Sequence, residues 1–219
     1  MSNREALRQR LRAGLTTLKL DLDDSTIERL LDYVDLLLRW NAAYNLTAVR
    51  DPGEMVTRHL LDSLAVLPHV TGNTLADLGT GAGIPGIPLV LARPELTVHL
   101  VDSNGKKARF LREAVRHLHL SSTRVDECRV EAVNGEFDCI TARAFATLAD
   151  MLAWGGHLLA PAGRWLALKG RFPQDELDKL PVGFVIDAVH RLDVPGLDAE
   201  RHLVIIRRSD RVDAGRMGS

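Results

Sequence analysis

The sequence predicts an α/β protein with a mostly parallel sheet, an antiparallel hairpin at the C-terminal end of that sheet, and an N-terminal helical segment. Three patterns lead to this prediction. The first 70 residues follow a helical hydrophobic period, short apolar runs alternate with helical stretches from residue 74, and the last two apolar runs are joined by a turn too short for a helix. Such alternation implies parallel strands with helices on both faces.

The helical segment is expected over residues 1–70. Its first helix should span residues 4–19, with Leu7, Leu11, Leu15 and Leu18 on one face. Residues 25–28 (STIE) fit a capping box, which predicts a second helix from there to about Trp40. Asp51 and Pro52 indicate the start of a third helix whose leucines point inward.

The second domain is expected over residues 71–208. Buried strands are predicted at 74–78, 97–101, 137–141 and 164–168, a further strand ahead of residue 129, and helices at 86–93, 105–119 and 147–154. The closing hairpin should pair residues 182–191 with 201–208, which completes a seven-stranded sheet. We expect the polar residues 209–219 to form a disordered tail.

Composition indicates an ordinary globular protein. The 219 residues are 46% hydrophobic and 26% charged, with a net charge of −1. No apolar run reaches the length of a membrane helix, and the charged N-terminus does not resemble a signal peptide, so we expect a cytoplasmic protein without membrane contact. The two cysteines lack a metal-type spacing, so no metal site is expected.

Two basic runs are candidate phosphate contacts in a chain that otherwise lacks a basic excess. Such runs are usually solvated helix faces, which is the alternative interpretation. The first run lies in the first 20 residues and consists of Arg4, Arg8, Arg10, Arg12 and Lys19. The second lies in the helix predicted at 105–119 and consists of Lys106, Lys107, Arg109, Arg112 and Arg116.

The most informative motif is the glycine-rich loop at residues 77–86 (DLGTGAGIPG), between a strand and a helix. Its glycines, Gly79, Gly81 and Gly83 among them, permit positive φ and close approach of a ligand to the backbone. The spacing also fits a dinucleotide-binding loop or a plain strand–helix turn. However, Asp77 at the strand end would repel a pyrophosphate, whereas it would attract the ammonium group of a methionine moiety.

A second acidic residue, Asp102, ends the next strand, where a carboxylate can accept both hydroxyls of a ribose. A nucleoside joined to an amino acid, without phosphate, satisfies Asp77 and Asp102 together. The sequence therefore predicts binding of S-adenosyl-L-methionine. Residues 129–131, after the third strand, are expected beside the adenine, and Arg143, after the fourth strand, faces the ligand crevice unless it is a surface ion-pair partner.

Several motifs together make the chain similar to a known family. The similarity runs over residues 33–207, and the motifs lie at 40–47 (WNAAYNLT), 58–63 (RHLLDS), 77–88, 102–111, 143–145 (RAF) and 167–170 (ALKG). In combination they resemble the bacterial small-subunit rRNA guanine-N7 methyltransferases, the RsmG family, formerly glucose-inhibited division protein B. The resemblance implies a class I, Rossmann-like methyltransferase fold. It also implies methylation of N7 of one guanine in the 530 loop of 16S rRNA within the small ribosomal subunit.

The resemblance places cofactor contacts at Gly79, Ile84, Val130, Glu131 and Arg143, with Arg143 also positioning the reacting groups. Candidate RNA contacts in the remaining motifs are Asn41, Asn45, Arg58, His59 and Lys169. Polar amides beside aromatic residues at a helix end suit either helix capping or stacking on bases. We expect a monomer. Three alternative functions stay open from the residues: a dinucleotide-dependent (NAD-type) oxidoreductase, a small-molecule methyltransferase, and a non-catalytic RNA-binding module.

Overall fold

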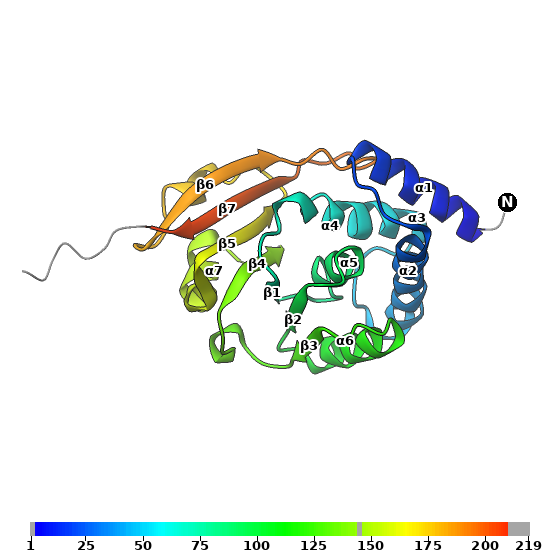
Figure 1. Cartoon of the computed structure of the whole chain (residues 1–219), viewed down its shortest axis with the longest axis horizontal. Coiled ribbons are helices and arrows are strands. Elements are labelled where there is room, and N and C mark those ends of the chain that lie inside the picture. Colours follow the sequence, from blue (N-terminus) through cyan, green and yellow to red (C-terminus); the bar gives the residue numbers. More distant parts are fainter. Residues whose placement is uncertain (1–2, 144–145, 210–219) are drawn as a thin grey trace, which may run out of the picture.

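The computed structural model describes residues 3–143 and 146–209 and contains one seven-stranded sheet in the order β3-β2-β1-β4-β5-β7-β6 (Figure 1). The first five strands pair in parallel, and β7 is antiparallel to both β5 and β6. The predicted fold class, a mostly parallel sheet with a closing antiparallel hairpin, is confirmed. The predicted tail falls almost wholly outside the described residues, as do Ala144 and Phe145 of the 143–145 motif.

The strands predicted at 74–78 and 97–101 have the predicted bounds, and those predicted at 137–141 and 164–168 are longer. The strands are β1 (Thr74–Leu78), β2 (Thr97–Val101), β3 (Thr123–Asp126), β4 (Phe137–Arg143), β5 (Leu159–Lys169), β6 (Phe184–Arg191) and β7 (His202–Arg208). Strands β4 and β5 are longer than predicted. They pair from Cys139 opposite Arg164 to Arg143 opposite Leu168, and after a shift of register Phe137 also pairs with Leu159. Arg143 is thus the last residue of its strand.

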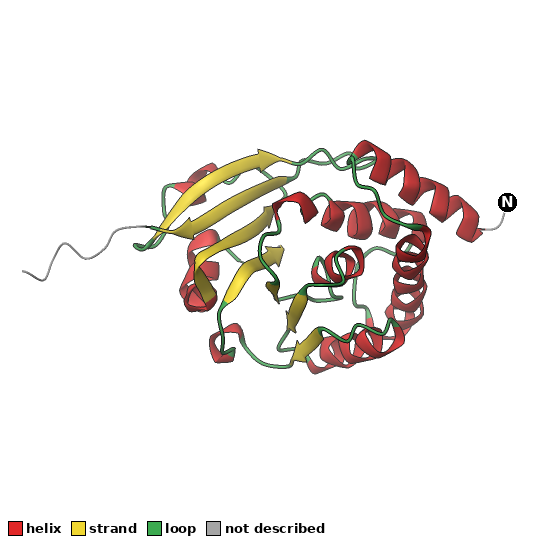
Figure 2. Cartoon of the chain, in the orientation of Figure 1, coloured by secondary structure: helices red, strands yellow, loops and turns green. Residues whose placement is uncertain are grey.

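Helices cover both faces of the sheet (Figure 2). One face packs against α5 (Gly86–Ala92) and α6 (Gly105–His117). Helix α2 (Asp24–Tyr44) packs on α5 and α6, and α1 (Asn3–Thr17) packs on α2, within the same core. The other face packs against α7 (Leu148–Gly155). Alternate residues of a strand enter different cores: Leu75 belongs to the first, and Ala76 to the second. This is the two-sided burial expected of a parallel sheet.

The capping box predicted at residues 25–28 is wrong. Helix α2 is capped by Asp23, whose carboxylate accepts from the backbone N–H of Thr26. Glu28 instead pairs with Arg4 at 2.8 Å and with Arg8 at 2.6 Å on α1. The helix also continues past the predicted end at Trp40 to Tyr44, because no residue in between interrupts the hydrogen-bonding pattern.

The N-terminal basic run serves packing between α1 and α2. Besides Glu28, Arg4 contacts Asp32 at 2.7 Å and Asp35 at 2.6 Å, and Arg12 pairs with Asp24. These acids neutralise Arg4, Arg8 and Arg12, which are three of the five cations that the sequence offered as phosphate contacts. Because Leu7, Leu11 and Leu15 are also buried, α1 is a structural helix.

The N-terminal helices and the sheet share one core, and one contact ties them directly to the glycine loop. The hydroxyl of the fully buried Tyr33 on α2 donates to the carbonyl of Ala82 at 2.7 Å. Burial raises the pKa of this phenol, so Tyr33 keeps its proton to donate. The division at residue 70 stays a prediction. No helix of the described part is long and apolar enough to cross a membrane.

The third helical segment begins at Asp51, as predicted, with Asp51 as its N-cap. It then changes geometry, from α3 (Pro52–Met55) through a π-helix, η1 (Val56–Leu61), into α4 (Asp62–Leu64). π-Helical turns are rare and are often found at functional sites. Here the turn carries Arg58 and His59 and leads directly into Asp62.

Candidate functional site

The glycine loop between β1 and α5 has the conformation that its composition predicts. Gly79, Gly81 and Gly83 have φ values of 66°, 62° and 89°, the left-handed region that side chains disfavour. Gly86 is required for a different reason, since a Cβ there would lie 2.4 Å from Leu100 and 2.9 Å from Asp77. The loop is joined to the end of β2 by the N–H of Gly81, which donates to Asp102 at 2.9 Å.

Asp77 lies beneath this loop and does not line a cavity, unlike the position expected for an ammonium partner. Its side chain is fully buried. It accepts hydrogen bonds from the hydroxyl of Thr80, from the N–H of Gly86 at 2.9 Å and from the hydroxyl of Thr141 at 3.0 Å. Asp77 therefore stabilises the loop. Ile84 is buried as well, and neither it nor Gly81 or Gly83 lines the cavity at the strand ends that is described below.

Burial raises the pKa of Asp77 to about 6, although its three hydrogen bonds act to lower it. In the unfolded chain an aspartate titrates near ~3.9. The folded state therefore binds the proton more tightly, and this contribution to stability is present at low pH and is lost as the pH rises from about 4 to 6. We expect the free energy of unfolding of the wild type, relative to Asp77→Asn, to fall by roughly 2–3 kcal/mol across that window.

The free energy of unfolding is measured by urea denaturation at a series of pH values. The control variant is Asp138→Asn. Hydrogen bonds from Asn73 and Thr74 lower the pKa of Asp138, so its contribution has the opposite sign and is lost as the pH falls below about 4. If the difference in free energy of unfolding between the wild type and Asp77→Asn stays constant between pH 4 and 6, the raised pKa of Asp77 is contradicted.

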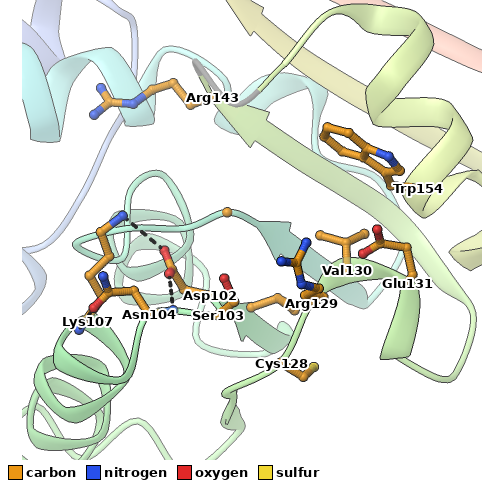
Figure 3. A pocket seen from close by; sticks show the side chains of 12 residues that line it. Asp102, Ser103, Asn104, Lys107, Cys128, Arg129, Val130, Glu131, Arg143 and Trp154 are labelled. Carbon is orange, nitrogen blue, oxygen red and sulfur yellow. Dashed lines mark hydrogen bonds and ion pairs between the residues drawn. The ribbon is translucent and has the colours of Figure 1, made fainter.

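A cavity of about 480 Å³ opens at the carboxyl ends of β1, β2 and β4 (Figure 3). Gly79 and Asp102 line it, together with Val130 and Glu131 of the 3₁₀ turn η3 (Val130–Ala132) and Arg143 of β4. The sequence predicted all five of these residues as cofactor contacts. Trp154 and Glu131 lie on one side of the cavity, and Asp102, Asn104 and Lys107 on the other (Figure 3).

Asp102 keeps hydrogen-bonding capacity for a ligand. One carboxylate oxygen accepts from Gly81 N–H and lies 3.4 Å from the ammonium of Lys107, and the other accepts from the N–H of Asn104 at 2.9 Å. A carboxylate offers about four acceptor positions. A ribose diol entering the cavity can use the remaining position and displace the long contact to Lys107.

A second cavity, of about 380 Å³, adjoins the first, and Arg143 lines both. Three of the predicted RNA contacts, Arg58, His59 and Lys169, line the second cavity. Lys169 is anchored by Glu176 and by the carbonyl of Ala146, each at 2.8 Å.

Asp62 orients two arginines of the second cavity. Its carboxylate is buried and pairs with Arg143 at 3.0 Å through one oxygen and with Arg201 at 3.0 Å through the other. The same Nη1 of Arg143 donates to the carbonyl of Arg58 at 3.2 Å. The described residues provide no hydrogen bond for Nε or Nη2 of Arg143, so those donors can meet a ligand.

His59 lines this cavity with a neutral ring. Burial, together with the nearby cation of Arg143, lowers the pKa of His59 to about 4. Its Nε2 lies 3.0 Å from the hydroxyl of Thr47, whereas its buried Nδ1 has no hydrogen-bond partner among the described residues.

The other two predicted RNA contacts do not line this cavity. Asn41 is buried, and its amide accepts from Thr47 N–H and donates to the carbonyl of Val49. Asn45 is the left-handed C-cap of α2. Asn45 thus has the capping role that the sequence left open, and the side chain of Asn41 holds the loop that follows the helix.

Sequence reasoning missed Asp62, Arg201 and Trp154. Asp62 belongs to the motif at 58–63, but its partners Arg143 and Arg201 lie 81 and 139 positions away in the chain, and no local pattern indicates such distant contacts. Trp154 lay in a predicted helix without a signal for its direction. Within the described ranges no group of three His, Cys, Asp or Glu side chains is arranged to hold a metal ion.

The sheet order, the glycine loop and an acidic residue at the end of β2 define a class I S-adenosylmethionine-dependent methyltransferase. Solved structures support this fold. TrmN from Thermus thermophilus has a TM-score of 0.57 at 20% identity, covering 70% of this chain and 53% of that one. The glycopeptide N-methyltransferase MtfA has a TM-score of 0.60 at 11% identity, covering 69% of this chain and 87% of that one.

The chain belongs to the rRNA small subunit methyltransferase G (GidB) family, whose model matches residues 26–204. A ribosomal RNA small subunit methyltransferase G from Xanthomonas euvesicatoria pv. vesicatoria is 59% identical over 85% of this chain and 89% of its own length. The protein of that name from Neisseria meningitidis serogroup C is 51% identical over 92% of this chain and 98% of its own length. The resemblance drawn from the motifs is confirmed.

Proposed function

We propose that this protein transfers the methyl group of S-adenosyl-L-methionine to N7 of a guanine in the 530 loop of 16S rRNA, in the cytoplasm and as a monomer. The observation that carries the proposal is the pair of adjoining cavities with Arg143 in the wall of both. A donor in the first cavity and a base in the second would meet at this side chain. The names of the relatives supply the class of RNA.

The first cavity fits S-adenosyl-L-methionine in size and in chemistry. Its volume lies within the range of small-molecule sites, and its lining offers a carboxylate at Asp102, close backbone at Gly79 and an aromatic wall at Trp154. The assignment uses Asp102, Gly79, Val130, Glu131 and Arg143 as the contacts. Asp77, Gly81, Gly83 and Ile84 then support the loop from behind.

The second cavity is the proposed acceptor site. Guanine presents N7 and O6 as acceptors on one edge. Nε and Nη2 of Arg143 can donate to O6, and Arg201 adds a second cation near the base. His59 remains neutral at physiological pH and lines this cavity without adding charge.

The reaction requires positioning and little acid–base chemistry. S-adenosyl-L-methionine would supply an activated methyl group, and guanine N7 has a free lone pair and no proton to lose. The protein has to hold the acceptor in line, keep N7 free of hydrogen bonds and exclude water. Asp62 contributes by fixing the directions of Arg143 and Arg201.

The experiment that tests this function is transfer of a tritiated methyl group to small ribosomal subunits that lack the modification, followed by identification of the product nucleoside. We expect 7-methylguanosine from the wild type. Naked 16S rRNA as a second substrate separates recognition of the RNA from recognition of the assembled subunit. Absence of label in RNA, or label in another nucleoside, would contradict the proposal.

The alternatives predict different results in the same preparation. A dinucleotide-dependent oxidoreductase should be stabilised against heat by NAD more than by S-adenosylhomocysteine. A small-molecule methyltransferase should transfer label without RNA. A non-catalytic module should bind RNA and transfer nothing.

A further inference from the structure

A groove on α6 has features that the two cavities do not explain. It is an open hollow of about 830 Å³ beside the cofactor cavity, with which it shares Ser103 and Asn104. Its walls are Tyr44 at the end of α2 and the cations Lys106, Arg109 and Arg112 of α6. These three side chains are spaced three residues apart and so project from neighbouring positions of one helix face.

The charge of the groove is only partly compensated. Arg112 pairs with Glu127 at 2.8 Å. The side chains of Lys106 and Arg109 are exposed and have neither an ion pair nor a hydrogen bond within residues 3–143 and 146–209. Arg116, farther along the same helix, differs because both oxygens of Glu113 bind it. The uncompensated cations of α6 thus lie at the end of the helix nearest the cofactor cavity.

Tyr44 adds an aromatic surface to this charge. Its ring is half-buried and stacks on Trp40, with centroids 5.1 Å apart and an interplanar angle of 27°. Trp40 in turn packs edge-on against Phe110 of α6, with centroids 5.8 Å apart. The Tyr44 ring is therefore rigidly supported, as a platform for a stacked base has to be.

The groove also lies close to the proposed acceptor cavity. Tyr44 lines the groove, and Thr47, three residues later, lines the acceptor cavity. Three steps along the chain separate their Cα atoms by no more than about 11 Å. A guanine bound in the acceptor cavity would bring the adjacent part of its strand to the groove.

We propose that this groove binds the nucleotide next to the methylated guanine, with its base against Tyr44 and its phosphate between Lys106 and Arg109. The proposal rests on the proposed function, because it needs an RNA strand that continues beyond the acceptor cavity. RNA is favoured over other partners because the groove combines uncompensated cations with a supported aromatic ring, the pair of features that binds single-stranded nucleic acid. The groove would increase affinity for RNA and would leave the chemical step unchanged.

The test compares two double variants with equal loss of charge. Lys106→Ala/Arg109→Ala removes the uncompensated cations, whereas Arg116→Ala/Arg124→Ala removes two exposed arginines that line none of the cavities described above. Affinity for a 16S rRNA fragment that contains the 530 loop is measured by fluorescence anisotropy at several salt concentrations. Each lost contact to a single strand should reduce the slope of log K against log salt by ~0.7, or ~1.4 for two contacts.

We expect the groove variant to show this smaller slope and a KM for RNA raised about tenfold. Its kcat at saturating RNA and its affinity for S-adenosylhomocysteine should equal those of the wild type. The control variant should retain the wild-type slope. Tyr44→Leu should also raise KM roughly tenfold, and Tyr44→Phe should restore it, because stacking needs the ring and not the hydroxyl.

Three results would overturn the inference. Equal slopes for the two double variants would mean that Lys106 and Arg109 do not contact phosphate. Unchanged binding of the fragment with weakened binding of the assembled subunit would assign the groove to a ribosomal protein. Failure of the wild type to methylate RNA would refute the proposed function itself. The wild type is assayed first, so this failure is distinguished from a failure of the groove proposal, which shows only when the variants are compared.

Discussion

Replacing Arg143 by alanine should reduce methyl transfer by at least ~100-fold, the size of effect seen when a preorganised donor is removed from a reacting centre. Arg143 lines both cavities, and its Nη1 is held by Asp62 and by the carbonyl of Arg58. Lysine keeps the charge but not the planar fork, so Arg143→Lys should lose most of the activity as well. Single-turnover transfer to small subunits measures this loss.

The ion pair with buried Asp62 makes a structural control necessary. Arg201→Ala removes the other partner of the same carboxylate, so it should lower the melting temperature about as much as Arg143→Ala does. Arg201 does not line the cofactor cavity, and cofactor affinity should be retained. If Arg143→Ala melts early while its folded fraction transfers methyl at the wild-type rate, Arg143 is an ion-pair residue only and the proposed site is wrong.

Asp102→Ala should weaken binding of S-adenosylhomocysteine by roughly 10- to 100-fold, the equivalent of a lost charged hydrogen bond of about 1.5–3 kcal/mol. The carboxylate lies at the end of β2 in the wall of the cofactor cavity, where a ribose can replace its long contact to Lys107. Titration calorimetry gives the dissociation constant directly. A melting curve without ligand reports any loosening of the glycine loop through Gly81.

Asp126→Ala is the matched control. Asp126 occupies the corresponding end of the neighbouring strand β3, opposite Val101, but it pairs with His99 and Arg124 and does not line the cavity. Its removal should leave cofactor affinity unchanged. If Asp102→Ala binds S-adenosylhomocysteine as tightly as the wild type does, Asp102 is not a cofactor contact.

The features that the sequence predicted well depend on neighbours in the chain. Strands β1 and β2 have the predicted bounds because each is an apolar run between turn residues. The glycine loop and Asp102 were located correctly because strand ends in a parallel sheet lie at one edge. The capping box failed because Asp23, two residues earlier, is an equally good cap, and Glu28 has a stronger partner in Arg4.

The sequence by itself determined the fold class, the family and the cofactor loop, since periodicity, turn chemistry and motif spacing are all local. Only the tertiary structure decided which charged groups are used. Burial and three hydrogen bonds assign Asp77 to support of the loop, and Glu28 of α2 pairs with Arg4 and Arg8. Asp62 is 81 and 139 positions from Arg143 and Arg201 in the chain, and only the fold brings both within 3.0 Å of its carboxylate. The physical reason is that desolvation and ion pairing depend on distances between atoms, which packing sets and sequence separation does not.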